Sequence, residues 1–368
     1  MVLFDVDQSY ALFALAGNTP CQAPLLEDKT LAWETALLKK THHSVYKNCL
    51  DLIDAYSDFA PWWERVLLAI YAGIGPPLAR CFGSNTRNLW QHADAIVGDL
   101  LAVSGMSPNK VAESLRQYVR LKREEDHNLS FEKARESIYD QPFYPLVTHF
   151  TLAFQPSAVA RLRFVRRLVE SVAASELVVA DLGCGSGAML CEVLRAQPGW
   201  TGYGLDISEA SINYARRLAA HKGVAERLQF QTGCLLNLPF ASDSLDVVIA
   251  SEVVEHLPHP ERVFDEISRV LAPGGLLLVT VPAESHTPAH MHALNSAEDL
   301  CGLIERAGLV VSSIQTKWHV SYGDDRKHIF AVAEAKREVE SIAEAPVYSL
   351  SVSVPHISSA ASSGIVSS

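Results

Sequence analysis

The 368-residue chain lacks several features that would assign it to a specialised class. Its 7 cysteines are scattered and form no CxxC pair, so neither a disulfide framework nor a zinc ribbon is indicated. The longest apolar stretch, near residues 66–79, is interrupted by glycine and proline and falls short of the roughly 20 residues that span a membrane. The first residues carry Asp5 and Asp7 but no basic cluster, which does not fit a signal peptide. We therefore expect a soluble, cytoplasmic protein with reduced thiols.

Basic charge is also scarce. The chain has 31 lysine and arginine residues against 42 aspartate and glutamate residues, a formal net charge of −11. A surface of this charge does not favour nucleic acid or an acidic membrane as the main partner. With 48% hydrophobic and 20% charged residues, the composition is typical of a soluble globular protein. We expect a small-molecule substrate, and the length favours two domains over one.

Hydrophobic periodicity divides the chain into three parts. In residues 1–155 apolar side chains recur at helical spacing, which predicts an all-α accessory domain that caps a site or forms a homodimer. In residues 156–337 short apolar runs alternate with amphipathic stretches, which predicts an α/β fold with a mostly parallel sheet covered on both faces. The last two runs of this part have no helix between them, so an antiparallel final strand is expected. Residues 338–368 are rich in serine and are predicted to form a flexible tail, although residues 347–354 could instead add an edge strand.

The segment VVADLGCGSGAML, which starts at Val178, places three glycines between an apolar strand and a helix. Glycine is tolerated where the backbone turns sharply or where no side chain fits. In open parallel sheets, ligands bind beyond the carboxyl ends of the strands. Gly183, Gly185 and Gly187 therefore mark the place where a ligand comes close to the backbone. Taken alone, the segment also fits the GxGxxA form of a dinucleotide site.

The acidic residues around these glycines separate the two ligand classes. Asp181 precedes the glycines, where a carboxylate repels a pyrophosphate and attracts a cation. S-adenosylmethionine carries a sulfonium and an ammonium group and no phosphate. Asp206 ends the next apolar run, where it suits the ribose hydroxyls of either cofactor. Asp181 therefore favours the sulfonium cofactor over a dinucleotide.

Two further segments complete a recognisable pattern. QTGCLLNLPFASDSLDVVIASEVVEHL covers the third and fourth apolar runs, and RVLAPGGLLLVTVP places a proline–glycine turn between a helix and the fifth run. Together with the glycines, these segments resemble the class I S-adenosylmethionine-dependent methyltransferases over residues 156–336. The resemblance implies a Rossmann-like sheet of seven strands, the last one antiparallel, with S-adenosylmethionine as the cofactor.

The resemblance also implies where the cofactor lies. The glycines pass beneath its methionine part, Asp206 holds the ribose, and Ile207 lies on the adenine. Leu235 covers the other adenine face, and the backbone of Ser251 contacts the methionine end. Cys234 stands where many relatives carry an acidic residue for the adenine amino group, and a thiol is a poor acceptor, so that contact is expected from another group. The predicted cofactor-binding residues are Asp181, Gly183, Gly185, Gly187, Asp206, Ile207, Cys234, Leu235, Ser251, Tyr139 and Tyr144.

Aromatic side chains gather in the segment YDQPFYPLVTHF, just before the α/β part. Tyr139, Phe143, Tyr144 and His149 are candidates for an aromatic wall over the cofactor, because an aromatic face attracts a sulfonium. The alternative is ordinary core between the two parts, since aromatic residues mostly fill cores.

Three residues are candidates for catalysis: His256, His290 and Glu252. His256 follows the fourth apolar run and is either a general base or a structural histidine. His290 lies beside His286 and His292 in VPAESHTPAHMHAL, a segment expected either to overhang the acceptor pocket or to be a solvated loop.

A metal site is a further alternative at the same place. Glu252, Glu255 and His256 form an ExxEH cluster similar to the metal-binding segments of some O-methyltransferases, and carboxylates with an imidazole can hold a divalent cation. Many metal-free relatives carry similar residues here, and we predict no metal.

The main functional hypothesis is methyl transfer to an oxygen, nitrogen or carbon of a small molecule. In such a reaction the enzyme mainly aligns donor and acceptor. A cyclase or lyase that uses the same cofactor and releases methylthioadenosine is the first alternative. A non-catalytic scaffold that keeps the cofactor fold is the second, and a dinucleotide-dependent oxidoreductase is the least favoured.

Overall fold

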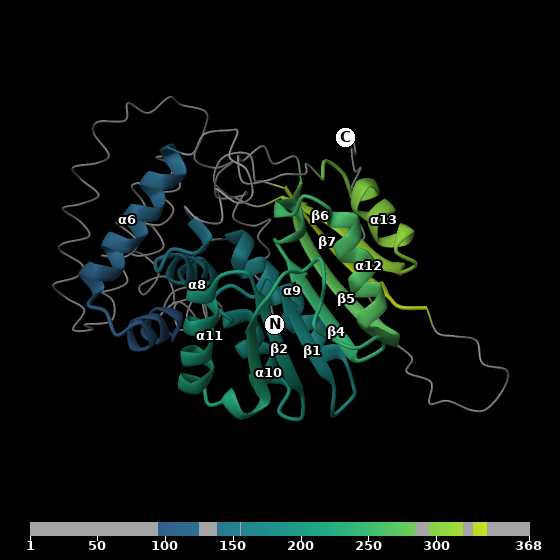
Figure 1. Cartoon of the computed structure of the whole chain (residues 1–368), viewed down its shortest axis with the longest axis horizontal. Helices are drawn as coiled ribbons and strands as arrows, with labels where there is room; N and C mark the ends of the chain where they lie inside the picture. The colour runs from purple at the N-terminus through teal and green to yellow at the C-terminus, as the bar shows by residue number, and fades with distance from the viewer. Residues whose placement is uncertain (1–94, 125–137, 155, 284–293, 319–326, 337–368) are drawn as a thin grey trace, which may run out of the picture. The chain divides into compact units, whose positions relative to one another are not determined.

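The computed structural model describes residues 95–124, 138–154, 156–283, 294–318 and 327–336 (Figure 1). Their centre is a 7-stranded sheet with the order β3-β2-β1-β4-β5-β7-β6. The strands are β1 (Val178–Leu182), β2 (Thr201–Asp206), β3 (Leu228–Thr232), β4 (Leu245–Ser251), β5 (Leu271–Ala283), β6 (Val310–Trp318) and β7 (Lys327–Glu334).

The strand directions confirm the predicted sheet. Strands β1 to β5 pair in parallel, whereas β7 runs antiparallel to both of its neighbours, β5 and β6. Leu182 at the end of β1 pairs with Leu205 in β2 and with Ala250 in β4. The carboxyl ends of these three strands therefore meet at one edge of the sheet, where the glycines begin.

The proline–glycine segment before the fifth run differs from the prediction. It lies inside β5 instead of forming a turn before it. The pairing moves from Leu271 opposite Leu245 to Leu276 opposite Val247, so the extra residues bulge out of the strand. Gly274 in this bulge has φ 80°, a conformation that glycine adopts without a steric penalty. Pairing with the neighbouring strand therefore continues past a sequence that is locally typical of a turn.

Helices cover both faces of the sheet, as predicted (Figure 1). Neighbouring residues of a strand point to opposite faces, so Val179 enters one core and Ala180 the other. The first core includes residues of the helical segment 95–104 and of five α-helices. The second core includes residues of two α-helices. The first set is α6 (Pro108–Glu124), α8 (Tyr144–Phe154), α9 (Pro156–Ser171), α10 (Ala188–Ala196) and α11 (Glu209–His221), and the second is α12 (Pro260–Val270) and α13 (Ala297–Arg306).

The predicted division into domains is not decided by these elements. Residues 1–94 and the predicted tail lie outside the described residues, and the bounds of the three parts stay a prediction. Across the described ranges, no helix combines the length and the apolar character needed to cross a membrane.

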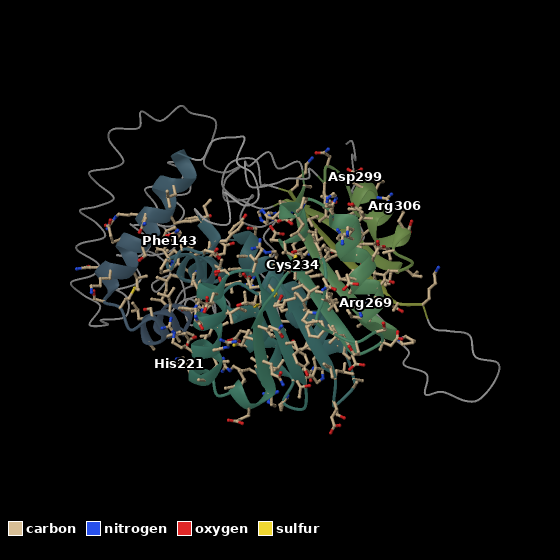
Figure 2. All side chains as sticks on the ribbon, viewed as in Figure 1. Phe143, His221, Cys234, Arg269, Asp299 and Arg306 are labelled. Atoms are coloured by element: carbon tan, nitrogen blue, oxygen red, sulfur yellow. The ribbon has the colours of Figure 1, made fainter. Side chains whose placement is uncertain are left out.

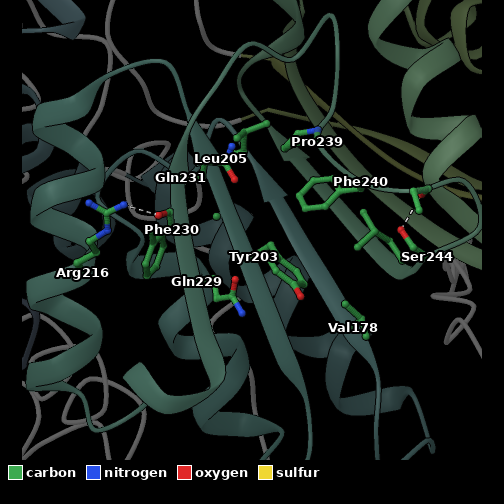
Figure 3. A pocket seen from close by; sticks show the side chains of 13 residues that line it. Val178, Tyr203, Leu205, Arg216, Gln229, Phe230, Gln231, Pro239, Phe240 and Ser244 are labelled. Carbon is green, nitrogen blue, oxygen red and sulfur yellow. Dashed lines mark hydrogen bonds between the residues drawn. The ribbon is translucent and has the colours of Figure 1, made fainter.

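Among the described residues, the connection 233–244 between β3 and β4 contains no helix, which leaves part of one sheet face without one from this connection. A hollow of about 620 Å³ lies there over β2 and β3 (Figure 3). The rings of Tyr203 and Phe240 meet edge to face in it, with centroids 5.4 Å apart. No residue of the glycine segment 183–187 lines this hollow.

Candidate cofactor and active site

The glycine loop, residues 183–187, follows β1 directly. Gly183, Gly185 and Gly187 have φ values of 74°, 51° and 71°, all in the left-handed region that favours glycine. A β-carbon on Gly183 would lie 2.5 Å from Cγ2 of Val253, and one on Gly187 would lie 2.7 Å from Cβ of Ala215. Two of the three glycines are therefore required by the packing of the chain itself, in addition to any approach of a ligand.

Asp206 at the end of β2 holds the glycine loop in place. Its Oδ2 accepts a hydrogen bond from the backbone N–H of Gly185 at 2.8 Å, and its Oδ1 accepts one from the N–H of Ser208 at 2.9 Å. Burial raises the pKa of Asp206, although these two hydrogen bonds oppose the rise. Each carboxylate oxygen has a second lone pair, so the side chain can still accept a ribose hydroxyl.

Asp181, within β1, is a second buried acid beside Asp206. Only 3% of Asp181 is exposed, and burial together with the charge of Asp206 raises the pKa of Asp181 to about 7. Two neighbouring buried carboxylates disfavour each other's ionised form, and a bound cation relieves that repulsion. The acidic pair Asp181–Asp206 therefore fits a cofactor that carries positive charge, and it does not fit a pyrophosphate.

Tyr139 and Tyr144 come together with His256 near this acidic pair. The ring centroids of Tyr139 and Tyr144 are 5.1 Å apart, and those of Tyr139 and His256 are 5.8 Å apart, both edge to face. The hydroxyl of Tyr139 lies 3.2 Å from Nδ1 of His256. Burial raises the pKa of Tyr144, and the nearby charge of Asp206 contributes to the rise. The structure thus brings together two residues of the predicted aromatic wall and the predicted base.

Phe143 and His149 do not join this group. Phe143 is buried against Tyr118 of α6, with ring centroids 6.2 Å apart, and it lies on the α6 side of the molecule (Figure 2). His149 is buried in α8, where its Nδ1 lies 2.8 Å from the hydroxyl of Tyr214. Helical geometry sends Tyr144 and His149, five positions apart, to different faces of α8. For Phe143 and His149 the structure matches the alternative interpretation, ordinary core.

The residues predicted to surround the adenine and the methionine end lie around the carboxyl edge. Ile207 follows β2 and is half-buried, and Leu235 is buried. Cys234 lies just beyond the end of β3 with an exposed side chain (Figure 2). Ser251 ends β4, and its hydroxyl shares a hydrogen bond of 2.9 Å with the hydroxyl of Thr280. Their roles toward a cofactor stay predictions.

Glu252 follows β4 and has φ 55°, which is uncommon for a residue other than glycine. Its Oε2 lies 3.5 Å from Nη1 of Arg161 and 3.2 Å from Nε2 of His328. Its Oε1 accepts a hydrogen bond from the hydroxyl of Thr280 at 3.2 Å. The carboxylate thus ties α9, β5 and β7 to the turn after β4. Sequence reasoning missed Arg161 and His328, because no local pattern links them to Glu252.

The three residues of the ExxEH cluster do not converge. Glu252 faces Arg161 and His328, whereas Glu255 is 1% exposed and its Oε1 lies 3.7 Å from Nε2 of His256. Within the described ranges, no group of three histidine, cysteine, aspartate or glutamate side chains is arranged to hold a metal ion. The third catalytic candidate, His290, lies outside the described residues, as do the two histidines near it.

Comparison with known proteins supports the resemblance to methyltransferases that the sequence shows. Residues 173–342 match the family described as "Methyltransferase domain". The 24-methylenesterol C-methyltransferase 2 of Oryza sativa subsp. japonica is 26% identical over 219 residues, which are 54% of this chain and 60% of that protein. The norajmaline N-methyltransferase of Rauvolfia serpentina is 29% identical over 163 residues, covering 43% of this chain and 53% of that protein. The chain thus spans less than two thirds of the length of these relatives.

Similar solved structures include a geranyl diphosphate methyltransferase in complex with SAM, which is 16% identical in sequence to this chain. That match covers 48% of this chain and 84% of the other chain, with a TM-score of 0.41. The strand order, the glycine loop after β1 and the carboxylate at the end of β2 define a class I methyltransferase fold. With the family match, they show that the chain carries a methyltransferase domain of the S-adenosylmethionine-dependent class, which confirms the resemblance seen in the sequence.

Proposed function

We propose that this protein transfers the methyl group of S-adenosylmethionine to a small-molecule acceptor. The observation that carries the proposal is the buried acidic pair Asp181–Asp206 beside the glycine loop. When bound, S-adenosylmethionine supplies a methyl group on a positively charged sulfur. Burial and mutual repulsion disfavour the ionised form of the two carboxylates, and a nearby positive charge stabilises that form. The protein's own contribution is to bind, to orient and to exclude water.

Named residues have distinct parts in this proposal. The glycine loop lies under the methionine end, with the backbone of Ser251 beside it. Asp206 accepts a ribose hydroxyl while it keeps its bond to Gly185. Ile207 and Leu235 enclose the adenine, and the rings of Tyr139 and Tyr144 offer aromatic faces to the cation. The adenine amino group is bound by a backbone carbonyl near Cys234, because the exposed thiol is a poor acceptor.

The acceptor is a small molecule in this proposal. Relatives named for a sterol, an alkaloid and a tocopherol support this class, and the net charge of −11 argues against a nucleic acid. Transfer to oxygen, nitrogen or carbon is compatible with these names. His256 provides the basic nitrogen that finally takes up the proton of an acceptor that arrives protonated.

Calorimetry tests the cofactor. We expect S-adenosylmethionine to bind and NAD to show no heat, whereas binding of NAD alone would contradict the proposal. Mass spectrometry of the cofactor products, with and without a metabolite extract, tests the reaction. Release of S-adenosylhomocysteine that depends on the extract supports methyl transfer. Release of methylthioadenosine without an extract supports the cyclase or lyase alternative, and absence of binding by any nucleoside cofactor supports a scaffold.

The proposal includes a homodimer formed through residues 1–155 and a cytoplasmic location. Sedimentation of the whole chain tests the first, with a monomer at micromolar concentration as the contradicting result. Microscopy of the tagged chain in its own cells tests the second, and a membrane or secreted signal would contradict it.

A further inference from the structure

We propose that Tyr139, His256 and Glu255 form a proton relay in which the hydroxyl of Tyr139 takes the proton of the acceptor. The inference rests on the proposed methyl transfer and deepens it, because it restricts the acceptor to one that arrives protonated, such as a hydroxyl. It also gives Tyr139 a role beyond the aromatic wall predicted from the sequence.

The relay consists of an imidazole ring with one group near each of its two nitrogens. Nδ1 of His256 lies 3.2 Å from the hydroxyl of Tyr139. Nε2 of the same ring lies 3.7 Å from Oε1 of Glu255, which is 1% exposed. A hydroxyl, an imidazole and a buried carboxylate in this order is the arrangement by which proteins activate a weakly acidic side chain.

The relay requires one particular tautomer of His256. The phenol of Tyr139 can donate to Nδ1 only when that nitrogen carries no hydrogen, so the relay places the ring hydrogen on Nε2. Nε2–H then faces the carboxylate of Glu255. When Nδ1 takes up a proton, the ring becomes an imidazolium, and the neighbouring negative charge stabilises it. Glu255 therefore acts as a positioning residue, because it works through His256.

In this proposal Tyr139 is the member of the relay that meets the acceptor. Both ring nitrogens of His256 contact protein groups. The ring of Tyr139 also packs edge to face against the ring of Tyr144. The charge of Asp206 contributes to the raised pKa of Tyr144, which places this second tyrosine near the acidic pair. The contacts thus connect Tyr144 to Tyr139, Tyr139 to His256, and His256 to Glu255.

The proton and electron balance of the step is simple. The acceptor gives its proton to the oxygen of Tyr139 while the hydroxyl proton of Tyr139 passes to Nδ1 of His256. The acceptor forms a bond to the methyl carbon as the carbon–sulfur bond breaks, and the electron pair stays on sulfur. The imidazolium of His256 afterwards returns its proton to water. No oxidant, reductant or metal is needed.

Replacing Tyr139 with phenylalanine separates the two roles of this residue. An aromatic wall requires only the ring, whereas the relay requires the hydroxyl. For Tyr139→Phe we expect the Kd for S-adenosylmethionine to stay within about threefold, and the rate of methyl transfer to fall by at least about 100-fold. His256→Asn is expected to give a similar loss and serves as a second variant if Tyr139→Phe does not fold.

Matched control variants exist outside the site. Tyr203→Phe removes a hydroxyl in the hollow over β2 and β3 (Figure 3). His259→Asn removes an exposed imidazole paired with Glu261 on α12. Both controls are expected to keep the native rate. The rate is followed as release of S-adenosylhomocysteine with tocopherol and norajmaline as probes, together with the metabolite extract.

A readout that needs no acceptor is nitrogen NMR of the whole chain labelled in histidine. We expect His256 to carry its hydrogen on Nε2. Tyr139→Phe should shift the Nδ1 resonance, and Glu255→Gln should shift that of Nε2, while Tyr203→Phe should move neither. A hydrogen on Nδ1, or resonances insensitive to both variants, would overturn the relay.

Failure of the relay and failure of the proposed function give different results. If S-adenosylmethionine does not bind, the proposed function is wrong, whatever the tautomer of His256. If the cofactor binds and Tyr139→Phe transfers methyl groups at the native rate, the relay is wrong and methyl transfer stands.

Discussion

The carboxylate of Asp206 accepts a hydrogen bond from the backbone N–H of Gly185 at 2.8 Å. The last residue of β2 thus holds the middle of the loop that follows β1, and the same carboxylate binds Ser208 at the start of α11. The side chain predicted to bind a ribose therefore also determines the shape of the loop beneath the cofactor. Stability and cofactor binding are expected to change together at this position.

Asp206→Ala tests this double role. The variant leaves the N–H groups of Gly185 and Ser208 buried without their acceptor, which costs about 1–3 kcal/mol for each group left unpaired. We expect a lower free energy of unfolding in urea and at least a tenfold weaker Kd for S-adenosylmethionine. Asp265→Ala, at an exposed position on α12, is the control and should change neither quantity. Native stability in Asp206→Ala would show that the loop holds its shape without this side chain.

The pH dependence of stability tests Asp181. Its folded-state pKa of about 7 lies above the model-peptide value of 3.8, so between these values the folded chain binds more protons than the unfolded chain. Asp181 therefore adds to the free energy of unfolding at pH 4, and this contribution disappears as the pH rises to about 7. The free energy of unfolding falls by at most about 1.4 kcal/mol per pH unit because of this group.

Urea unfolding of the native chain and of Asp181→Asn at several pH values isolates this contribution. The difference between the two free energies cancels groups that titrate equally in both. We expect the native chain to lose stability relative to Asp181→Asn between pH 4 and pH 7, and the difference to become constant above that range. A difference that does not vary with pH would show that Asp181 titrates normally.

Gly187→Ala and Gly223→Ala separate backbone strain from steric overlap. Both glycines have nearly the same φ, 71° and 70°. A β-carbon on Gly187 would lie 2.7 Å from Cβ of Ala215, whereas one on Gly223 would have no atom within 4 Å. We expect Gly223→Ala to destabilise the fold by about 1–2 kcal/mol, from strain alone. Gly187→Ala should cost about 1–3 kcal/mol more, measured by urea unfolding. Equal losses would contradict the packing of α11 on the loop.

Glu252→Gly and Glu252→Ala test the strain after β4. Both variants remove the contacts with Arg161 and His328, but only glycine adopts φ 55° without a steric penalty. We therefore expect Glu252→Gly to be about 1 kcal/mol more stable than Glu252→Ala. At Glu209, in the first turn of α11, the order should reverse, because alanine is the better helix former. Melting curves of the four variants give both comparisons.

Much of the fold follows from local patterns. The helix from Ala188 to Ala196 and the strand from Leu245 to Ser251 both lie where apolar spacing predicts them. The bulge around Gly274 was not predicted, because a proline–glycine pair locally favours a turn. It lies within β5 because pairing with β4 and β7 continues on either side of it.

The candidate site was predicted less completely. The glycines and Asp206 were found because each stands at a fixed position after a strand, where ligands of such sheets bind. The hydrogen bond between the Gly185 N–H and the Asp206 carboxylate was not predicted, nor were the partners of Glu252. Arg161 lies on α9 and His328 on β7, and no spacing in the sequence relates either residue to the turn after β4.

The sequence by itself determined the elements, their order and the place of the glycine loop, because hydrophobic periodicity and glycine conformation act over a few neighbouring residues. Only the tertiary structure decided which of the predicted aromatic residues meet His256, which acids are buried together, and what Glu252 binds. These properties depend on distance and burial between elements far apart in the chain, and electrostatic interactions respond steeply to both.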